Sequence, residues 1–308
     1  MCHEFTFRSA DGKTDLHAAE WIPQSGEVRA VLQVSHGVAE YILRYGAFAR
    51  YLTERGIAVV GHDHLGHGDS LTAGGTRLYF GPKGSWAYLA DDLNTRCNMA
   101  KKRFPGVPYF LLGHSMGSFA ARSFLIRYPG QVDGCILMGT AYQSLLTLKA
   151  GHRLACLEAG RKGEREPSPM LEHLVFGNCV KAFPNGRTEL DWLSANQANV
   201  DRYWADPLCG GTPTAGLFRE LLWGMAFNEE RSNLSRMDMD TPVLFVSGQE
   251  DPVGGMGRDV ERARDSFLRA GVRDVELKLW PGLRHELLNE EPWQAVADQL
   301  LDWLERHL

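Results

Sequence analysis

A serine between two glycines, in the segment Gly113–Gly117 with the sequence Gly-His-Ser-Met-Gly, is the feature of this chain that most strongly indicates chemistry. The segment follows an apolar run, Pro108–Leu112, and precedes a stretch of helical pattern, Ser118–Tyr128. Glycines on both sides let a buried strand turn sharply into a helix, which leaves the serine hydroxyl exposed on a strained backbone. The helix start would stabilise negative charge there. We predict that Ser115 is a nucleophile; the alternative is a serine that only caps the helix.

A serine nucleophile needs a histidine to remove its proton and a carboxylate to orient that histidine. Asp251 and His285 each follow a predicted strand, at the end where ligands collect in open α/β sheets. Their order after Ser115 is the order used by hydrolases with this type of turn. We predict Asp251 as the orienting acid and His285 as the base. Glu250 is the competing acid, while Asp251 could instead be a turn residue before Pro252 and His285 a surface histidine.

The reaction also needs two backbone N–H groups to stabilise the negative carbonyl oxygen of the intermediate. Met116, which follows the nucleophile, is expected to supply one. The second is expected from the loop after the predicted strand Ala30–Val34, where Gly37 permits close approach and Val38 carries the N–H. The alternative is an ordinary turn after a strand.

A histidine-rich segment, His62–His67, has a pattern similar to the zinc motif of metallo-β-lactamase hydrolases. Those proteins have an aspartate where this chain has Gly66, and further ligands cannot be assigned in their order. We therefore predict no metal and no organic cofactor, and we interpret the segment as a turn beside the active site.

The elements that must position these residues follow from the hydrophobic pattern. Short apolar runs alternate with helical patterns, which is typical of a mostly parallel sheet covered by helices on both faces. The predicted strands are Phe5–Arg8, Leu16–Trp21, Ala30–Val34, Ile57–Gly61, Tyr109–Leu112, Gly134–Met138, Val243–Val246 and Val275–Leu279. The predicted helices are Arg44–Glu54, Ala87–Lys102, Ser118–Tyr128, Arg258–Ala270 and Trp293–Leu304. Residues 142–238 interrupt the alternation, so we predict an insertion between two core segments, 1–141 and 239–308.

Composition excludes several classes of function. The 308 residues are 44% hydrophobic, which is enough for a large core, and the net charge of -5 without a basic patch argues against binding nucleic acid. The six cysteines form no C-x-x-C pair, which favours a reducing compartment. Because the first residues lack a signal-peptide pattern and no apolar run is long enough for a membrane span, we expect a cytoplasmic protein.

Four motifs resemble the α/β-hydrolase family, within it the branch of monoacylglycerol lipases and bacterial lysophospholipases, also grouped as serine aminopeptidase-like hydrolases. They are the loop His36–Tyr45, the turn Asp63–Ser70, the elbow Gly113–Gly117 and the segment Pro281–Glu286. The resemblance implies the α/β-hydrolase fold, with a mostly parallel eight-stranded sheet and helices on both faces. It also implies that residues 142–238 form a helical cap over the pocket.

The same resemblance implies roles for individual residues. The catalytic set would be Ser115, Asp251 and His285, and the oxyanion hole would be the N–H groups of Val38 and Met116. The residues expected to contact the substrate are His36, Gly37, Glu40 and His114. For Glu40, an ion pair with Arg44 that only braces the loop is an equal alternative. Ala39 stands where many relatives have a second glycine, which predicts a stiffer loop.

We therefore expect hydrolysis of a carboxylic ester through an acyl-enzyme, on a monoacylglycerol or a similar single-chain lipid. The alternatives are a lysophospholipase, a short-chain carboxylesterase, an aminopeptidase that uses a cap carboxylate such as Glu189 or Glu220, and a ligand-binding protein without activity. One helical face in the insertion could guide an acyl chain or contact a membrane transiently, or it could pack on the core; it consists of Leu146, Ala150, Leu154 and Leu157. The oligomeric state is not predicted.

Overall fold

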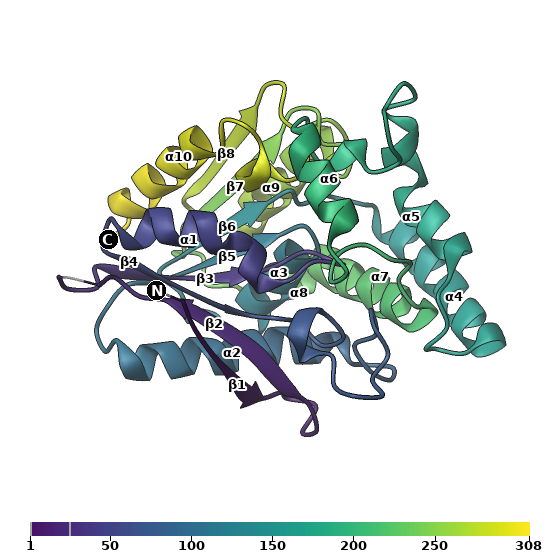
Figure 1. Cartoon of the computed structure of the whole chain (residues 1–308), viewed down its shortest axis with the longest axis horizontal. Helices are drawn as coiled ribbons and strands as arrows, with labels where there is room; N and C mark the ends of the chain where they lie inside the picture. The colour runs from purple at the N-terminus through teal and green to yellow at the C-terminus, as the bar shows by residue number, and fades with distance from the viewer. Residues whose placement is uncertain (1, 25) are drawn as a thin grey trace.

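The computed structural model describes residues 2–24 and 26–308, and within them eight strands form one sheet (Figure 1). The strand order is β1-β2-β4-β3-β5-β6-β7-β8; β2 runs antiparallel to both neighbours and all other pairs are parallel. The strands are β1 Cys2–Arg8, β2 Asp15–Trp21, β3 Ala30–Ser35, β4 Ile57–His62, β5 Tyr109–His114, β6 Gly134–Met138, β7 Val243–Gly248 and β8 Val275–Trp280. The predicted mostly parallel sheet is confirmed.

Two bounds differ from the sequence prediction for a local reason. The edge strand β1 begins at Cys2 rather than at Phe5, because it pairs along the whole of β2 and its polar residues need no buried face. The helix predicted at Arg44–Glu54 is present as α1, Gly46–Thr53, and a 3-10 turn, Ile42–Tyr45, precedes it.

Helices cover both faces of the sheet. Residues of α1 and α10 join one hydrophobic cluster, and residues of α2, α3 and α9 join the other (Figure 1). These helices are α1 Gly46–Thr53, α2 Trp86–Arg103, α3 Met116–Arg127, α9 Arg258–Ala270 and α10 Trp293–Arg306. Alternate residues of β5 serve the two clusters, since Leu111 points to one face and Leu112 to the other.

The register of the sheet brings the predicted site residues to one edge. Ser35 of β3 pairs with Gly113 of β5, and Gly248 of β7 pairs with Trp280 of β8. The loops that follow these parallel strands therefore leave the sheet at the same side, which is where open α/β sheets bind ligands.

Between β6 and β7 the chain forms a group of helices that gathers at one end of the sheet, at the right of Figure 1, while the C-terminus lies at the other end. We call residues 142–238 the cap. Its helices are α4 Leu145–Lys162, α5 Pro169–Lys181, α6 Gln197–Ala205, α7 Ala215–Glu229 and α8 Arg231–Leu234. The cap has a hydrophobic cluster of its own, in which Leu148 of α4, Leu171 of α5 and Phe218 of α7 are buried.

The apolar face predicted on α4 is not the face that packs. The helix buries Leu148, Ala155 and Ala159, whereas Leu146 and Leu157 are 82% and 71% exposed. Packing on the core is therefore wrong for the predicted face: Ala150 and Leu154 border a cavity beside Ser115, and Leu146 and Leu157 are open to solvent or to a lipid. Among the described residues, no helix has both the length and the apolar character needed to cross a membrane.

Candidate active site

Ser115 lies at the sharp turn between β5 and α3, with φ 52° and ψ -121°. A non-glycine residue with positive φ is strained, and a serine held this way at a strand end is typical of a nucleophile elbow. The flanking glycines are required by close approach: a Cβ on Gly117 would lie 2.0 Å from the Ser35 carbonyl oxygen, and one on Gly113 would lie 2.4 Å from the Gly117 carbonyl oxygen. The turn can therefore form only where side chains are absent at both positions.

Asp251 and His285 meet at the same edge, from the loops after β7 and β8. Nδ1 of His285 lies 2.9 Å from Oδ2 of Asp251, and both residues are buried. Asp251 also accepts hydrogen bonds from the Val253 N–H at 2.9 Å and from the Ser247 hydroxyl at 3.2 Å. Glu250, the competing acid, is exposed to solvent. The carboxylate that orients His285 in this structure is therefore that of Asp251.

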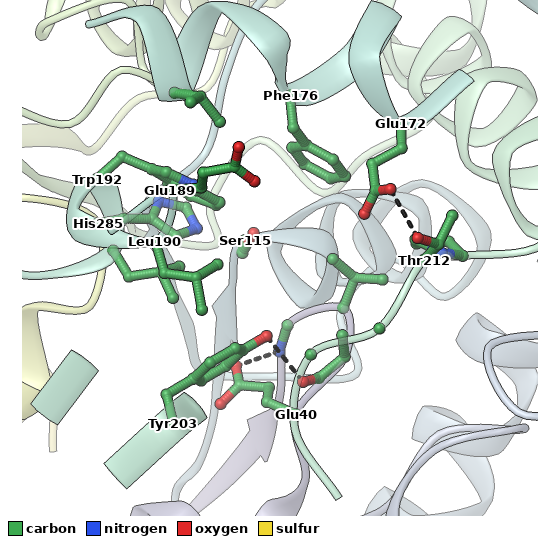
Figure 2. Close-up of a pocket in the computed structure, with 18 of the residues that line it drawn as sticks. Glu40, Ser115, Glu172, Phe176, Glu189, Leu190, Trp192, Tyr203, Thr212 and His285 are labelled. Atoms are coloured by element: carbon green, nitrogen blue, oxygen red, sulfur yellow. Dashed lines mark hydrogen bonds between the residues drawn. The ribbon is translucent and has the colours of Figure 1, made fainter. Parts of the chain in front are cut away.

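With Nδ1 facing Asp251, the Nε2 atom of His285 is the free nitrogen of the ring. His285 and Ser115 border the same cavity, as Figure 2 shows. No hydrogen bond joins these two residues within residues 2–24 and 26–308, and such contacts commonly tighten only when substrate binds. The arrangement can take the proton of a serine hydroxyl and return it to a leaving group.

The backbone N–H groups of Val38 and Met116 have no acceptor in the part of the chain that the structure describes. Both residues border a cavity together with Ser115. Two free N–H groups beside a nucleophile suit an oxyanion, because they stabilise charge without having to reorganise.

The cap holds in place the loop of Gly37, Val38 and Ala39, which we call the oxyanion loop after its predicted role. Ala39 has φ 56°, the left-handed conformation that favours glycine, so the stiffer loop predicted at this position is also a strained one. The Ala39 carbonyl accepts hydrogen bonds from the Gly210 N–H and from the Tyr203 hydroxyl, each at 2.9 Å. Two cap residues therefore hold the peptide next to Val38.

Glu40 braces the same loop from below. One carboxylate oxygen accepts hydrogen bonds from the Gly37 N–H at 2.6 Å, from the Tyr45 hydroxyl at 2.9 Å and from His114 Nδ1 at 2.9 Å; the other accepts from Arg44 at 2.8 Å. Burial alone would raise the pKa of Glu40, but its contacts with His114 and Arg44 lower it. Burial likewise disfavours the His114 cation, but the hydrogen bond to Glu40 raises the pKa of His114. Glu40 borders the cavity with its acceptors engaged, which supports the bracing role.

Arg44 extends this brace to the loop of His285. Its guanidinium forms a two-point ion pair with Glu286, at 2.9 and 2.7 Å, and Glu286 follows His285 directly. Asn199 of α6 donates to the same carboxylate at 2.7 Å. The oxyanion loop, the loop that contains His285 and the cap therefore share one buried network of ion pairs and hydrogen bonds.

His36, which was expected to contact the substrate, is fully buried and borders neither cavity beside Ser115. Its Nδ1 lies 2.7 Å from the Gly37 carbonyl oxygen, and its Nε2 accepts from the His64 N–H at 2.9 Å. The imidazole therefore connects the loop of Gly37 to the loop of His64. Gly37, Glu40 and His114 do border the cavity.

The histidine-rich segment lies behind the oxyanion loop. His62, His64 and His67 are buried, and among the described residues their nitrogens do not converge on a common point as metal ligands must. Burial lowers the pKa of His62 and of His67 to about 3, and it lowers that of His64 as well. The three imidazoles are neutral packing groups around His36.

Ser115 lies where two cavities meet. One, of about 620 Å³, is bordered by His285, and we call it the His285 cavity. The other, of about 650 Å³, is bordered by Met116 but not by His285, and we call it the Met116 cavity. The Met116 cavity is lined by apolar side chains that include Phe119, Leu148, Leu154, Leu174, Leu222 and Met225.

The sequence missed most residues that shape the His285 cavity, because they lie in the irregular parts of the cap. Trp192 packs against His285 with ring centres 5.3 Å apart, and Phe176 borders both cavities. Of the two cap carboxylates considered for an aminopeptidase, Glu189 borders the His285 cavity (Figure 2). Glu220 is instead buried, pairs with Arg219 and accepts from the N–H groups at the start of α2.

Comparison with known proteins finds a family and relatives that match most of the chain. The sequence pattern of the family described as serine aminopeptidase, S33, matches residues 26–292. A monoacylglycerol lipase of Mycolicibacterium smegmatis is 29% identical over 295 residues, which cover 94% of this chain and 92% of the relative. A human monoglyceride lipase is 29% identical over 290 residues, covering 92% and 84%. A thermostable carboxyl esterase from Bacillus coagulans, solved in complex with glycerol, superposes with a TM-score of 0.91 at 25% identity, covering 99% of this chain and 98% of that one.

Proposed function

Because this chain belongs to the serine aminopeptidase S33 family of α/β-hydrolases, in its monoacylglycerol lipase branch, we propose that it hydrolyses monoacylglycerols or similar single-chain acyl esters. The chain is an ester hydrolase, as its relatives and structural neighbours are. The glycerol complex of the Bacillus coagulans esterase supports an acylglycerol as substrate.

One observation carries the proposal: Ser115 lies on a strained elbow beside the His285–Asp251 pair, at the junction of two cavities. An ester needs room on both sides of its carbonyl carbon, one side for the acyl chain and one for the alcohol. Apolar side chains along the Met116 cavity suit a hydrocarbon chain.

In the proposed mechanism Ser115 attacks the ester carbonyl while Nε2 of His285 takes its proton. Asp251 fixes the tautomer of His285 and stabilises its cation, and the N–H groups of Val38 and Met116 stabilise the oxyanion. His285 then protonates the departing alcohol, which leaves an acyl-serine. Water, deprotonated by His285, releases the acid and restores the enzyme.

The proposal divides the chain into a catalytic core, residues 1–141 and 239–308, and the cap, residues 142–238, which would select the substrate. The exposed leucines of α4 support transient contact of the cap with a lipid surface, since basic Lys149 and Arg153 lie on the same helix. All six cysteines are free, which supports a reducing compartment such as the cytoplasm.

The test is a substrate panel assayed with the wild type and with Ser115→Ala side by side. It contains 1-monoacylglycerols and p-nitrophenyl esters of several chain lengths, lysophosphatidylcholine and an aminoacyl amide. Preferred turnover of monoacylglycerols that disappears in the variant supports the proposal. Turnover of short esters alone would instead indicate a general carboxylesterase, and turnover of the amide alone an aminopeptidase.

A further inference from the structure

The two cavities beside Ser115 can be assigned by the direction of proton transfer. His285 must deliver a proton to the leaving oxygen, so the alcohol must lie on the side of His285. His285 borders only one of the two cavities. The alcohol of the ester therefore occupies the His285 cavity, and the acyl chain occupies the Met116 cavity.

Glutamate side chains outnumber lysine and arginine side chains in the lining of the His285 cavity. Four carboxylates border it, and they belong to Glu40, Glu172, Glu189 and Glu286. Arg44 forms buried ion pairs with both Glu40 and Glu286, and His114 also contacts Glu40. Among the described residues, Glu172 and Glu189 have no cation within ion-pair distance. The single lysine of the lining, Lys181, lies at the opposite end of α5 from Glu172; it is exposed, as Glu189 is, whereas Glu172 is half-buried.

Figure 2 shows both of these cap carboxylates directed into the space between the cap and Ser115. Glu172 accepts a hydrogen bond from the Thr212 hydroxyl at 2.7 Å, which fixes its position. The Glu189 carboxylate has no hydrogen-bond partner within residues 2–24 and 26–308, so its oxygens are available to a ligand. An alcohol in this cavity thus meets two negative charges, both from the cap.

We propose that Glu172 and Glu189 select the alcohol of the substrate by charge, favouring neutral and cationic alcohols and rejecting those that carry a phosphate. The inference rests on the proposed ester hydrolysis and narrows it. A neutral glycerol can donate hydroxyl hydrogen bonds to the carboxylates. A phosphate in the same place would be repelled by both, and the buried Arg44 and His114 are already paired with Glu40 and Glu286.

The test compares three octanoyl esters, whose short chains keep them monomeric: 1-octanoylglycerol, 1-octanoylglycerol 3-phosphate and octanoylcholine. The quantity measured is the ratio of kcat/KM between esters, because a general loss of activity cancels in that ratio. For Glu172→Gln and Glu189→Gln, we expect the preference for the neutral ester over the phosphate ester to fall about fivefold each. We expect the relative rate with octanoylcholine to fall as well.

Two control variants sharpen the result. Lys181→Gln removes the one lysine of the lining, so it should shift the ratio in the opposite direction. Glu305→Gln, an exposed position near the other end of the sheet, should leave the ratio unchanged. In the wild type the preference should also weaken as salt is raised.

Equal kcat/KM values for the neutral and phosphate esters in the wild type would overturn the inference. Ratios that stay constant in both glutamine variants would overturn it too, although ester hydrolysis itself would stand. A protein that cleaves none of the three esters would contradict the proposed function instead.

Discussion

The edge of the sheet and the cap meet at Ser115, but they are built differently. At the edge, buried polar groups have several fixed partners: Asp251 accepts three hydrogen bonds and Glu40 accepts four. In the cap, Glu189 faces the cavity, and Leu146 and Leu157 face solvent. The difference separates two tasks. Groups that react must be held still, whereas groups that receive different substrates need only line the space.

If this contrast is correct, a change at the edge should affect all substrates, and a change in the cap should affect only some. The largest effect is expected for Asp251→Asn, which keeps the size of the side chain but loses the charge and the correct tautomer of His285. We expect kcat to fall by roughly 10⁴-fold for every ester, as in other serine triads. Steady-state assays test this prediction.

The matched control is Glu250→Gln at the neighbouring position. It should keep nearly full activity because Glu250 is exposed and outside the hydrogen-bond network. A larger loss in Glu250→Gln than in Asp251→Asn would show that the wrong acid is assigned.

Arg44→Gln should have the next largest effect, and it should act on stability. The substitution leaves two buried carboxylates, Glu40 and Glu286, without their cation. Breaking a buried ion pair from one side typically costs about 3–5 kcal/mol, so we expect a clear drop in the free energy of unfolding and in activity. Urea unfolding measures the first quantity. An unchanged unfolding midpoint would mean that the network does not brace the edge.

The buried histidines behind the oxyanion loop should make the edge sensitive to acid. His62 and His67 have pKa values of about 3 when folded, against about 6.5 when unfolded. Protons therefore bind the unfolded chain first, and stability should fall from pH 6.5 towards pH 3 by about 1.4 kcal/mol per pH unit for each of them.

His17 behaves in the opposite way but does not rescue stability at low pH. Its hydrogen bond to Asp63 raises its pKa to about 9, so its contribution is complete below pH 6.5 and is lost only as the pH rises through 9.

Urea titrations at pH 7.5, 6.5, 5.5 and 4.5 test the predicted slope of the free energy of unfolding against pH. His62→Phe should lower this slope by about 1.4 kcal/mol per pH unit, the contribution of one proton. His3→Gln, at an exposed position, should leave the slope unchanged.

Substitutions at the exposed cap leucines should affect binding and hydrolysis of aggregated substrate only. Replacing both Leu146 and Leu157 by Ser should lower binding and hydrolysis of long-chain monoacylglycerol in vesicles by about tenfold, because two large apolar contacts are lost. Hydrolysis of monomeric 1-octanoylglycerol should not change. The control is Leu268→Ser, an exposed leucine of α9 far from the cap in the sequence. A loss on the monomeric ester would show that these leucines do more than contact lipid.

The smallest effect is expected at Ala39. Glycine there relieves the positive φ, but it also loosens the unfolded chain, so the two contributions nearly cancel. We expect Ala39→Gly to change the free energy of unfolding by less than about 1 kcal/mol. A large gain in thermal stability would indicate that the loop stores more strain than its backbone angle suggests.

The sequence predicted the edge better than the cap, for a physical reason. Strand ends in a parallel sheet are constrained by periodic burial, so Ser115, Asp251 and His285 can be placed from the runs that precede them. The Gly-x-Ser-x-Gly turn adds steric limits that only glycine meets. Because of these constraints, the sheet that the sequence predicts agrees with the sheet in the structure.

Prediction failed where contacts are long-range and the local pattern is weak. On α4 the apolar period identified the face that borders the Met116 cavity and solvent, because the face that packs uses small residues such as Ala155 and Ala159. His36 was expected to contact the substrate because the resemblance of the loop His36–Tyr45 implied it, although its side chain accepts a hydrogen bond from the His64 N–H inside the protein. The cavity residues Trp192 and Tyr203 follow no repeat that could be recognised.

The two hydrogen bonds from the cap to the Ala39 carbonyl have a consequence for engineering. Cap exchange between related hydrolases is an attractive way to change specificity, as if the cap were a separate module. Here the segment that contains Tyr203 and Gly210 also holds the peptide beside the oxyanion hole. A chimera joined at β6 and β7 would therefore bring a foreign segment against this loop, and a working graft should keep the parent's own residues 190–211 within the exchanged cap.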